Sequence, residues 1–151
     1  ISDIYSWLNT VVPELFVQSV EGIERRTLTY KDQDILVKPL RCYPRRPEDS
    51  KINWEDGVDK IVRLVRASSH PFEGAYSFVE DLDMVRIFKA MAYQPSFDFL
   101  SMPGQICLSN EGNPVIAAGD GMVELQEISV NGLSNIDSKK SLLTSFRSRL
   151  K

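Results

Sequence analysis

Short strand-like runs separated by turn residues fill residues 74–129, and this alternation constrains the fold more than any other feature of the chain. Five strands are predicted, at residues 75–79, 84–92, 104–109, 114–118 and 122–128. Turn signals separate them, namely Glu80-Asp81, Pro103-Gly104, Gly112-Asn113-Pro114 and Gly119-Asp120-Gly121. The Asp-Gly pair at residues 120–121 is typical of a tight β-hairpin turn. This number of short strands in so short a stretch indicates a small antiparallel barrel, of which the OB fold is one form.

The first part of the chain shows two local patterns. Residues 3–21 place apolar side chains three and four residues apart, which predicts an amphipathic helix. Pro13 lacks a backbone N–H, so we expect a kink or a break near residues 9–12. Residues 27–30 and 34–38 are two short β-type runs, and together they predict a hairpin.

Two further helices are predicted on either side of the strand region. Asn53 is a favourable N-cap residue with acidic residues after it, so a helix is predicted from there to Ser68-Ser69. Its apolar face is expected to consist of Val58, Ile61, Val62 and Val65. A final helix is predicted over residues 137–150. The expected fold class is therefore α+β, a small antiparallel OB-like β-barrel preceded by a connector helix and by a helical and hairpin segment.

The net charge of −3 conceals an uneven distribution. Residues 68–133 carry nine acidic residues against two basic ones, whereas residues 134–151 carry five basic residues against Asp137. Nucleic-acid binding depends largely on Lys and Arg neutralising phosphates, so only this basic tail suits that task. The same bases also fit the solvated face of a helix. No apolar run approaches the roughly 18 residues of a membrane span, and we expect a cytoplasmic protein with no membrane partner.

The histidine and the cysteines give no sign of a catalytic or metal centre. His70 is the one histidine, and beside a proline at a helix–strand junction it is expected to be structural rather than a general base. Cys42 and Cys107 lie in no metal-binding spacing, so two reduced thiols and no metal site are expected.

The segment Tyr43-Pro44-Arg45-Arg46-Pro47-Glu48-Asp49 is stiff and charged. Its arginines could clamp a phosphate in a bidentate manner, or they could pair with nearby carboxylates and rigidify a linker. Tyr43 could stack on a ring or cover the core. The residues alone leave these alternatives open.

Several ordered motifs resemble the C-terminal region of the folate-dependent N-formyltransferases, a family that includes methionyl-tRNA formyltransferases and sugar N-formyltransferases. Residues 52–54, 61–67 and 71–76 resemble the family's inter-domain pattern I-x-W, I-x-R-x-x-R-A and P-x-x-G-A-[YF]. Residues 102–106 and 117–128 resemble its C-terminal barrel, and the start of the chain resembles the last helix of its catalytic domain.

This resemblance divides the chain into two parts. Residues 1–52 would be the C-terminal remnant of the catalytic domain plus a linker, and residues 53–151 would be the OB-like C-terminal domain. The family transfers a formyl group from N10-formyltetrahydrofolate to an amine. Its catalytic Asn-x-His pair and Asp would lie before Ile1, and His70 does not match them because Ser68 stands two residues earlier. We therefore expect no catalytic residue and no bound cofactor on this chain, and no activity without the N-terminal catalytic domain as its partner.

The resemblance leaves the acceptor substrate with alternatives. The segment at residues 43–49 resembles the sugar-type members, which makes a nucleotide-linked amino sugar the expected acceptor. It also makes Tyr43, Arg45 and Arg46 the expected substrate-binding residues. The alternative is a methionyl-tRNA formyltransferase that contacts tRNA through the basic tail. A third interpretation is an interaction module, in which the apolar face of residues 3–21 forms a homodimer.

Overall fold

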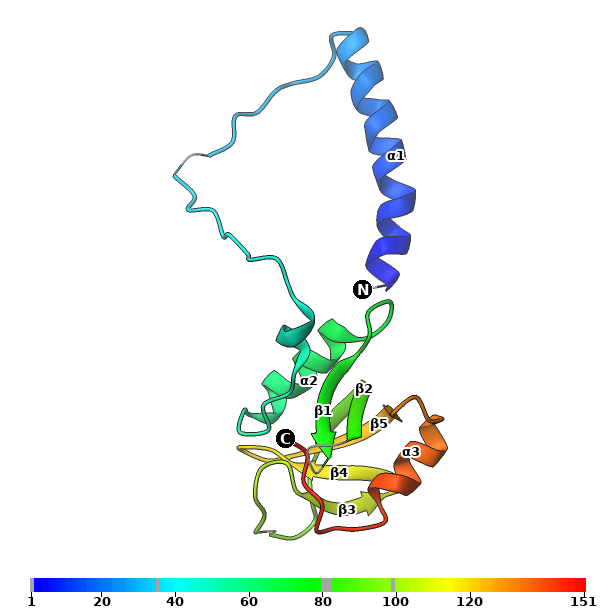
Figure 1. The fold of residues 1–151 in the computed structure, drawn as a ribbon. Helices are drawn as coiled ribbons and strands as arrows, with labels where there is room; N and C mark the ends of the chain where they lie inside the picture. Colours follow the sequence, from blue (N-terminus) through cyan, green and yellow to red (C-terminus); the bar gives the residue numbers. More distant parts are fainter. Residues whose placement is uncertain (1, 35, 80–82, 99) are drawn as a thin grey trace. The chain divides into compact units, whose positions relative to one another are not determined.

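The computed structural model describes residues 2–34, 36–79, 83–98 and 100–151 (Figure 1). The chain forms two compact units, Ile1–Arg45 and Arg46–Lys151. The first unit contains one long helix. The second contains the sheet, two shorter α-helices and residues 46–57 before α2, here called the connector. Within the described ranges, no helix combines the length and the apolar character that crossing a membrane requires.

The first unit consists of helix α1 and an extended segment. Helix α1 spans Ser2–Glu24 and continues through Pro13, so the break expected near that proline is not found in this helix. At its end the Thr27 N–H donates to the Gly22 carbonyl (2.9 Å), and Arg26 adopts a positive φ of 56°. These features are typical of a Schellman cap, which satisfies carbonyls at the end of a helix.

The hairpin predicted for residues 27–38 is not formed in the described part of this segment. The contacts there are local, since the Leu36 N–H donates to the Asp34 side chain (2.9 Å) and the Val37 N–H to the Asp34 carbonyl (3.3 Å). An isolated two-stranded hairpin is at best marginally stable in water. The described residues of the first unit supply no third strand for these two runs, which explains why the prediction was wrong.

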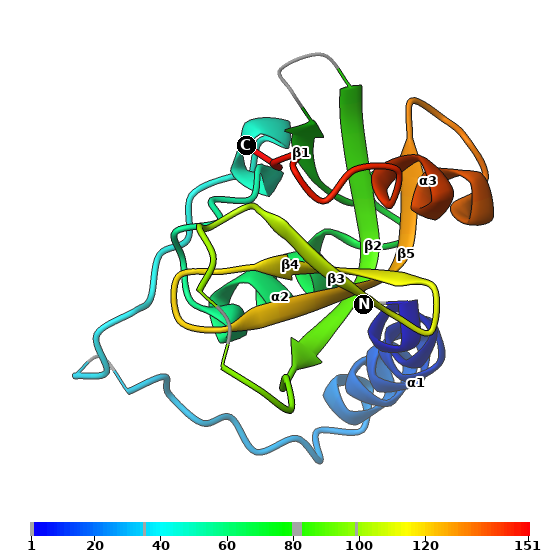
Figure 2. The same ribbon diagram turned by 90° about the horizontal axis from the view of Figure 1, so that it is seen from below.

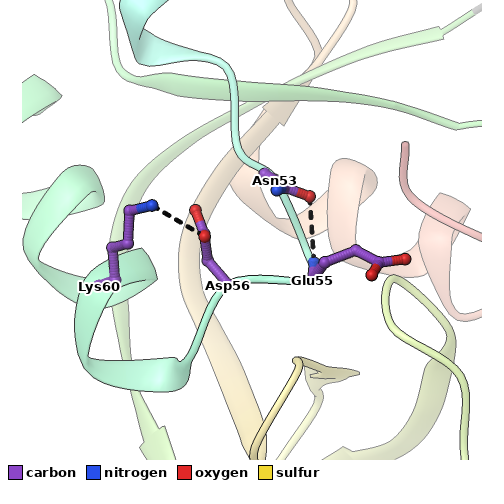
Figure 3. A network of polar contacts seen from close by, with 4 residues as sticks. All are labelled: Asn53, Glu55, Asp56 and Lys60. Atoms are coloured by element: carbon purple, nitrogen blue, oxygen red, sulfur yellow. Dashed lines mark hydrogen bonds and ion pairs between the residues drawn. The ribbon is translucent and has the colours of Figure 1, made fainter.

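Helix α2 spans Val58–Ser68 and begins later than predicted. Asn53 forms a turn of its own, in which its side-chain oxygen accepts from the Glu55 N–H (3.2 Å) (Figure 3). Its carbonyl accepts from the Asp56 N–H (3.1 Å). The predicted apolar face of the helix is confirmed at Ile61 and Val65, which are both 1% exposed.

Five antiparallel strands form the sheet of the second unit in the order β1-β2-β5-β4-β3. The strands are β1 Ala75–Val79, β2 Asp83–Tyr93, β3 Ile106–Asn110, β4 Asn113–Ala117 and β5 Met122–Val130. Each predicted strand is present, with small differences at the ends. The β4–β5 hairpin around residues 120–121 is also confirmed, with Ala117 opposite Met122. The predicted turn at Glu80-Asp81 lies outside the described residues.

Residues 148–151, here called the closing segment, bridge the two edges of this sheet instead of extending a helix (Figures 1 and 2). Helix α3 spans Asn135–Leu142 and ends well before the predicted residue 150. Lys151 and Phe78 of β1 exchange two backbone hydrogen bonds (2.8 and 3.0 Å), and the Leu150 N–H donates to the Gly104 carbonyl just before β3 (2.8 Å). The bridging makes the sheet barrel-like and leaves Leu150 2% exposed.

One hydrophobic core joins the connector to the barrel. Ile52 and Trp54 enter it from the connector, Ile61 and Val65 from α2, and Leu150 from the closing segment. Inward side chains of the sheet complete it, among them Ala75, Val85, Ile87, Ile106, Ile116, Val123, Leu125, Ile128 and Val130. The connector from Ile52 onward is therefore part of the barrel's core.

Candidate functional site

The connector and the closing segment form a cavity of about 400 Å³ in the second unit. It is lined by Lys51, Ile52, Asn53, Trp54, Glu55, Pro103, Leu150 and Lys151. The lining residues comprise two lysines, one glutamate, one asparagine and four residues with largely apolar side chains.

Trp54, one of the lining residues, is linked to β1 and to the closing segment through Ser77. Its indole N–H donates to the Ser77 hydroxyl of β1 (2.9 Å), and that hydroxyl donates to the Lys151 carbonyl (2.9 Å). Trp54 is 4% exposed and Ser77 is fully buried. Three segments that are distant in sequence are thus tied together by a chain of satisfied polar groups.

The Gly119-Asp120 turn between β4 and β5 holds the start of helix α2. The Gly119 N–H donates to the Asp56 carbonyl (3.0 Å), and the Asp120 carboxylate accepts from the Val58 N–H (2.7 Å). A side chain at residue 119 would collide with the Glu55 carbonyl oxygen. Docking of helix α2 therefore explains both residues of this turn. Gly119 lets the turn approach the backbone of residues 55–56, and Asp120 caps the N-terminus of the helix.

Gly104 allows the closing segment to approach the barrel closely. Its φ of 82° lies in the left-handed region, and a Cβ there would collide with the Leu150 carbonyl oxygen. Its N–H donates to the Ala117 carbonyl (2.8 Å). This part of the Met102–Gln105 motif thus assembles the barrel.

An aromatic pair lies beside Lys51, on the outward face of β1. Lys51 forms a bridge with Tyr76, and its ammonium group lies 5.8 Å from the centre of the Phe78 ring. The Tyr76 and Phe78 rings meet edge to face, with centroids 5.7 Å apart and an interplanar angle of 84°. Both rings are partly exposed, whereas Ser77 between them is buried, as the alternation of a strand requires.

The predicted substrate-binding residues lie elsewhere. Tyr43, 77% exposed, and Arg45 belong to the extended segment of the first unit. Arg46 opens the second unit, where its N–H donates to the Asp49 carboxylate (2.8 Å) in a 3-10 turn over Pro47–Ser50. The lining of the cavity contains none of the three. The observed bond shows local stiffening at Arg46, and a substrate contact by these residues stays a prediction.

His70 packs against the barrel. Its ring stacks on Phe88 with centroids 4.6 Å apart and an interplanar angle of 4°, and its Nε2 lies 3.8 Å from the Glu127 carboxylate. These contacts attach the start of the α2–β1 loop to β2 and β5, so the histidine has a structural role.

The two cysteines are both free thiols in different surroundings. Cys42 is exposed, whereas Cys107 lies on β3 and is buried. Burial raises the pKa of the Cys107 thiol, and hydrogen bonds involving Ser101 and Ala117 only partly oppose this rise. Cys107 is therefore the less reactive of the two.

The fold and the site together define a small β-barrel module whose turns at Gly104 and at Gly119-Asp120 attach the closing segment and helix α2. A family described as "Formyl transferase, C-terminal domain" matches residues 45–144. This chain belongs to the formyltransferase C-terminal domain family.

Curated relatives extend the match over most of the chain. The methionyl-tRNA formyltransferase of Thermodesulfovibrio yellowstonii is 26% identical over 135 residues, which covers 88% of this chain and 40% of that protein. The methionyl-tRNA formyltransferase of Akkermansia muciniphila is 25% identical over 143 residues, which covers 89% of this chain and 43% of that protein. The chain therefore spans less than half of the length of these relatives.

Solved structures of HypX from Aquifex aeolicus share the fold. One variant superposes with a TM-score of 0.60 at 21% identity, covering 89% of this chain and 24% of HypX. A second variant gives a TM-score of 0.54 at 25% identity, covering 78% of this chain and 20% of HypX.

Proposed function

We propose that this chain is the C-terminal part of a methionyl-tRNA formyltransferase and that its barrel unit contributes to binding the tRNA. The observation that carries the proposal is the match to relatives of that name over nearly nine-tenths of the chain. The comparisons favour this acceptor over the nucleotide-linked amino sugar that residues 43–49 suggested, and no relative described above is named as a sugar formyltransferase.

In this proposal the chemistry belongs to a preceding catalytic domain. That domain binds N10-formyltetrahydrofolate and supplies the catalytic groups, residues 1–52 form its end and the linker, and residues 53–151 form the barrel domain. The core position of Ile52 supports a linker that is anchored at its barrel end. This chain alone has no formyltransferase activity, and turnover by the purified chain with formyl-folate would refute that division.

The distribution of charge supports a role for the basic tail. Lys139 and Lys140 lie on α3, and Arg147, Arg149 and Lys151 follow in and before the closing segment. Only Asp137 opposes them in residues 134–151, whereas the strand region is strongly acidic. Cations gathered on one part of an acidic domain direct a polyanion to that part.

Binding of tRNA at several salt concentrations tests the proposal. The wild-type chain should bind tRNA with an affinity that falls steeply with salt, and Lys140→Gln should reduce the slope of log K against log salt by about 1. The matched control is Lys89→Gln, which removes an exposed lysine of β2 opposite Glu127. Salt-insensitive tRNA binding combined with saturable binding of a nucleotide-linked amino sugar would return the acceptor to the sugar class.

Homodimer formation through α1 stays a prediction. Large apolar side chains of this helix are exposed, among them Ile4, Trp7, Leu15 and Phe16. Exposed apolar surface of this extent favours a partner, either the preceding domain or a second copy. Sedimentation of the chain at rising protein concentration tests this prediction. A chain that stays monomeric at every concentration would exclude the homodimer.

A further inference from the structure

The last part of β2 leaves one of its two edges without a partner strand. β1 pairs with β2 only from Asp83 to Ile87, whereas β5 pairs with it as far as Tyr93 (Figure 2). Among the described residues, Lys89–Tyr93 are therefore paired along the β5 side alone. The backbone N–H and C=O groups along an unpaired edge are a template for a further strand.

The outer edges of β1 and β3 are covered in part by other segments. The Ile52 N–H of the connector donates to the Tyr76 carbonyl of β1 (2.8 Å), and the Ser148 carbonyl of the closing segment accepts from the Ile106 N–H of β3 (3.4 Å). Folded proteins also protect a strand edge with charged residues and prolines. Lys89 is the one charged residue in the last five residues of β2, which contain no proline. This end of β2 therefore lacks the protection that the other two edges receive.

The outward side chains of this stretch form a largely apolar row. The pairing with β5 is irregular around Lys89, and beyond it Ala90 packs against the core. Because side chains alternate along a strand, Met91 points outward, with Lys89 and Tyr93 on the same face. Met91 is 45% exposed, and the Gln126 side-chain amide donates to its sulfur (2.8 Å). An exposed apolar row beside an unpaired edge favours a partner strand with apolar side chains of its own.

We propose that this edge pairs with the same edge of a second copy of the chain, antiparallel and about a two-fold axis at Met91. In that register Met91 faces Met91 of the second copy, Lys89 faces Tyr93, and Ala90 faces Ala92. No like charges lie opposite each other, and each lysine lies beside an aromatic ring. The stretch is thus complementary to itself, as a two-fold interface requires, and this favours a second copy over an unrelated extended peptide.

Cross-linking of the full chain tests the register directly. In a Cys42→Ser background, which leaves only the buried native thiol, Met91→Cys is treated with a short bismaleimide. It should form covalent dimers at least about tenfold faster than Leu100→Cys, because opposed cysteines react at a millimolar effective concentration. Leu100 is the matched control, since it is fully exposed on the loop after β2. Lys89→Cys and Tyr93→Cys should cross-link rapidly when mixed and slowly when each is alone.

Sedimentation equilibrium tests the same contact without a reagent. Met91→Lys places two ammonium groups opposite each other at the axis, so it should raise the Kd of self-association at least about tenfold. Leu100→Lys adds the same charge away from the edge and should leave the Kd unchanged, and thermal unfolding of each variant verifies folding.

The results distinguish this interface from the other proposals. Equal self-association of Met91→Lys and Leu100→Lys, or equal cross-linking of Met91→Cys and Leu100→Cys, would refute pairing at β2. Self-association that persists in Met91→Lys would then assign the contact to another surface, such as α1. A wild-type chain that is monomeric at every concentration would overturn the proposal as well. None of these results bears on the tRNA proposal, which the salt dependence of tRNA binding decides.

Discussion

Replacement of Asp120 by Ala should weaken the attachment of helix α2 to the barrel. The Asp120 carboxylate accepts the Val58 N–H at 2.7 Å and caps the helix from a turn 62 residues further along the chain. Loss of a cap costs about 1 kcal/mol, and loss of a negative charge at a helix N-terminus adds about 0.3–1 kcal/mol. The free energy of unfolding should therefore fall by about 1–2 kcal/mol. The Gly119–Asp56 bond (3.0 Å) remains, so the helix should stay docked.

Urea unfolding followed by circular dichroism measures this loss. Asp120→Asn keeps an oxygen acceptor without the charge and should lose less than half as much as Asp120→Ala. Asp98→Ala removes an exposed carboxylate elsewhere and should change stability by no more than about 0.5 kcal/mol. The dependence on urea concentration should be the same in all variants. If Asp120→Ala were as stable as Asp98→Ala, the capping argument would be wrong.

Two further predictions concern the closing segment and the thiols. Gly104→Ala should cost at least about 3 kcal/mol, because the residue has a φ of 82° and the new Cβ would collide with the Leu150 carbonyl. Gly112→Ala, with a φ of 81° but open space around it, should cost only about 1–2 kcal/mol, and equal losses in urea unfolding would contradict the role of Gly104. Cys107 should react with iodoacetamide at about pH 8 more slowly than exposed Cys42, because burial raises its pKa and only the thiolate attacks. Raising the pH should narrow this difference, and peptide mapping that finds Cys107 alkylated first would overturn it.

The strand region could be predicted from sequence because its signals are local. Turn residues such as Gly119-Asp120-Gly121 end the apolar runs at nearly the observed positions, and the period of two within each run reports which side is buried. The family resemblance rested on the same region and on the connector helix, and the family match confirms it.

Two of the errors lie where a residue had two local choices. Asn53 can cap a helix or form its own turn, and the structure selects the turn because Asp120 supplies the cap at Val58. The last residues show a similar ambiguity. Arg147, Arg149 and Lys151 alternate with Ser148 and Leu150, a period of two that is typical of a strand. The residues before them have helical spacing, and for that reason the helix was predicted to continue to residue 150.

The cavity could not be found from sequence, because its lining comes from residues 51–55, from Pro103 and from residues 150–151, which are far apart in the chain. Arg45 and Arg46 were predicted as substrate-binding residues because their charges are adjacent in sequence. Lys51 and Lys151 are far apart in sequence, and they line one cavity only in the folded barrel.

The sequence by itself determined the strands, the buried face of α2 and membership of the family, because turn chemistry and periodicity act over a few residues. Only the tertiary structure decided where α2 begins, that residues 148–151 close the sheet, and that residues 51–55 and 150–151 line one cavity. Each of these depends on hydrogen bonds between segments far apart in the chain, and such bonds form only when the barrel core brings those segments together.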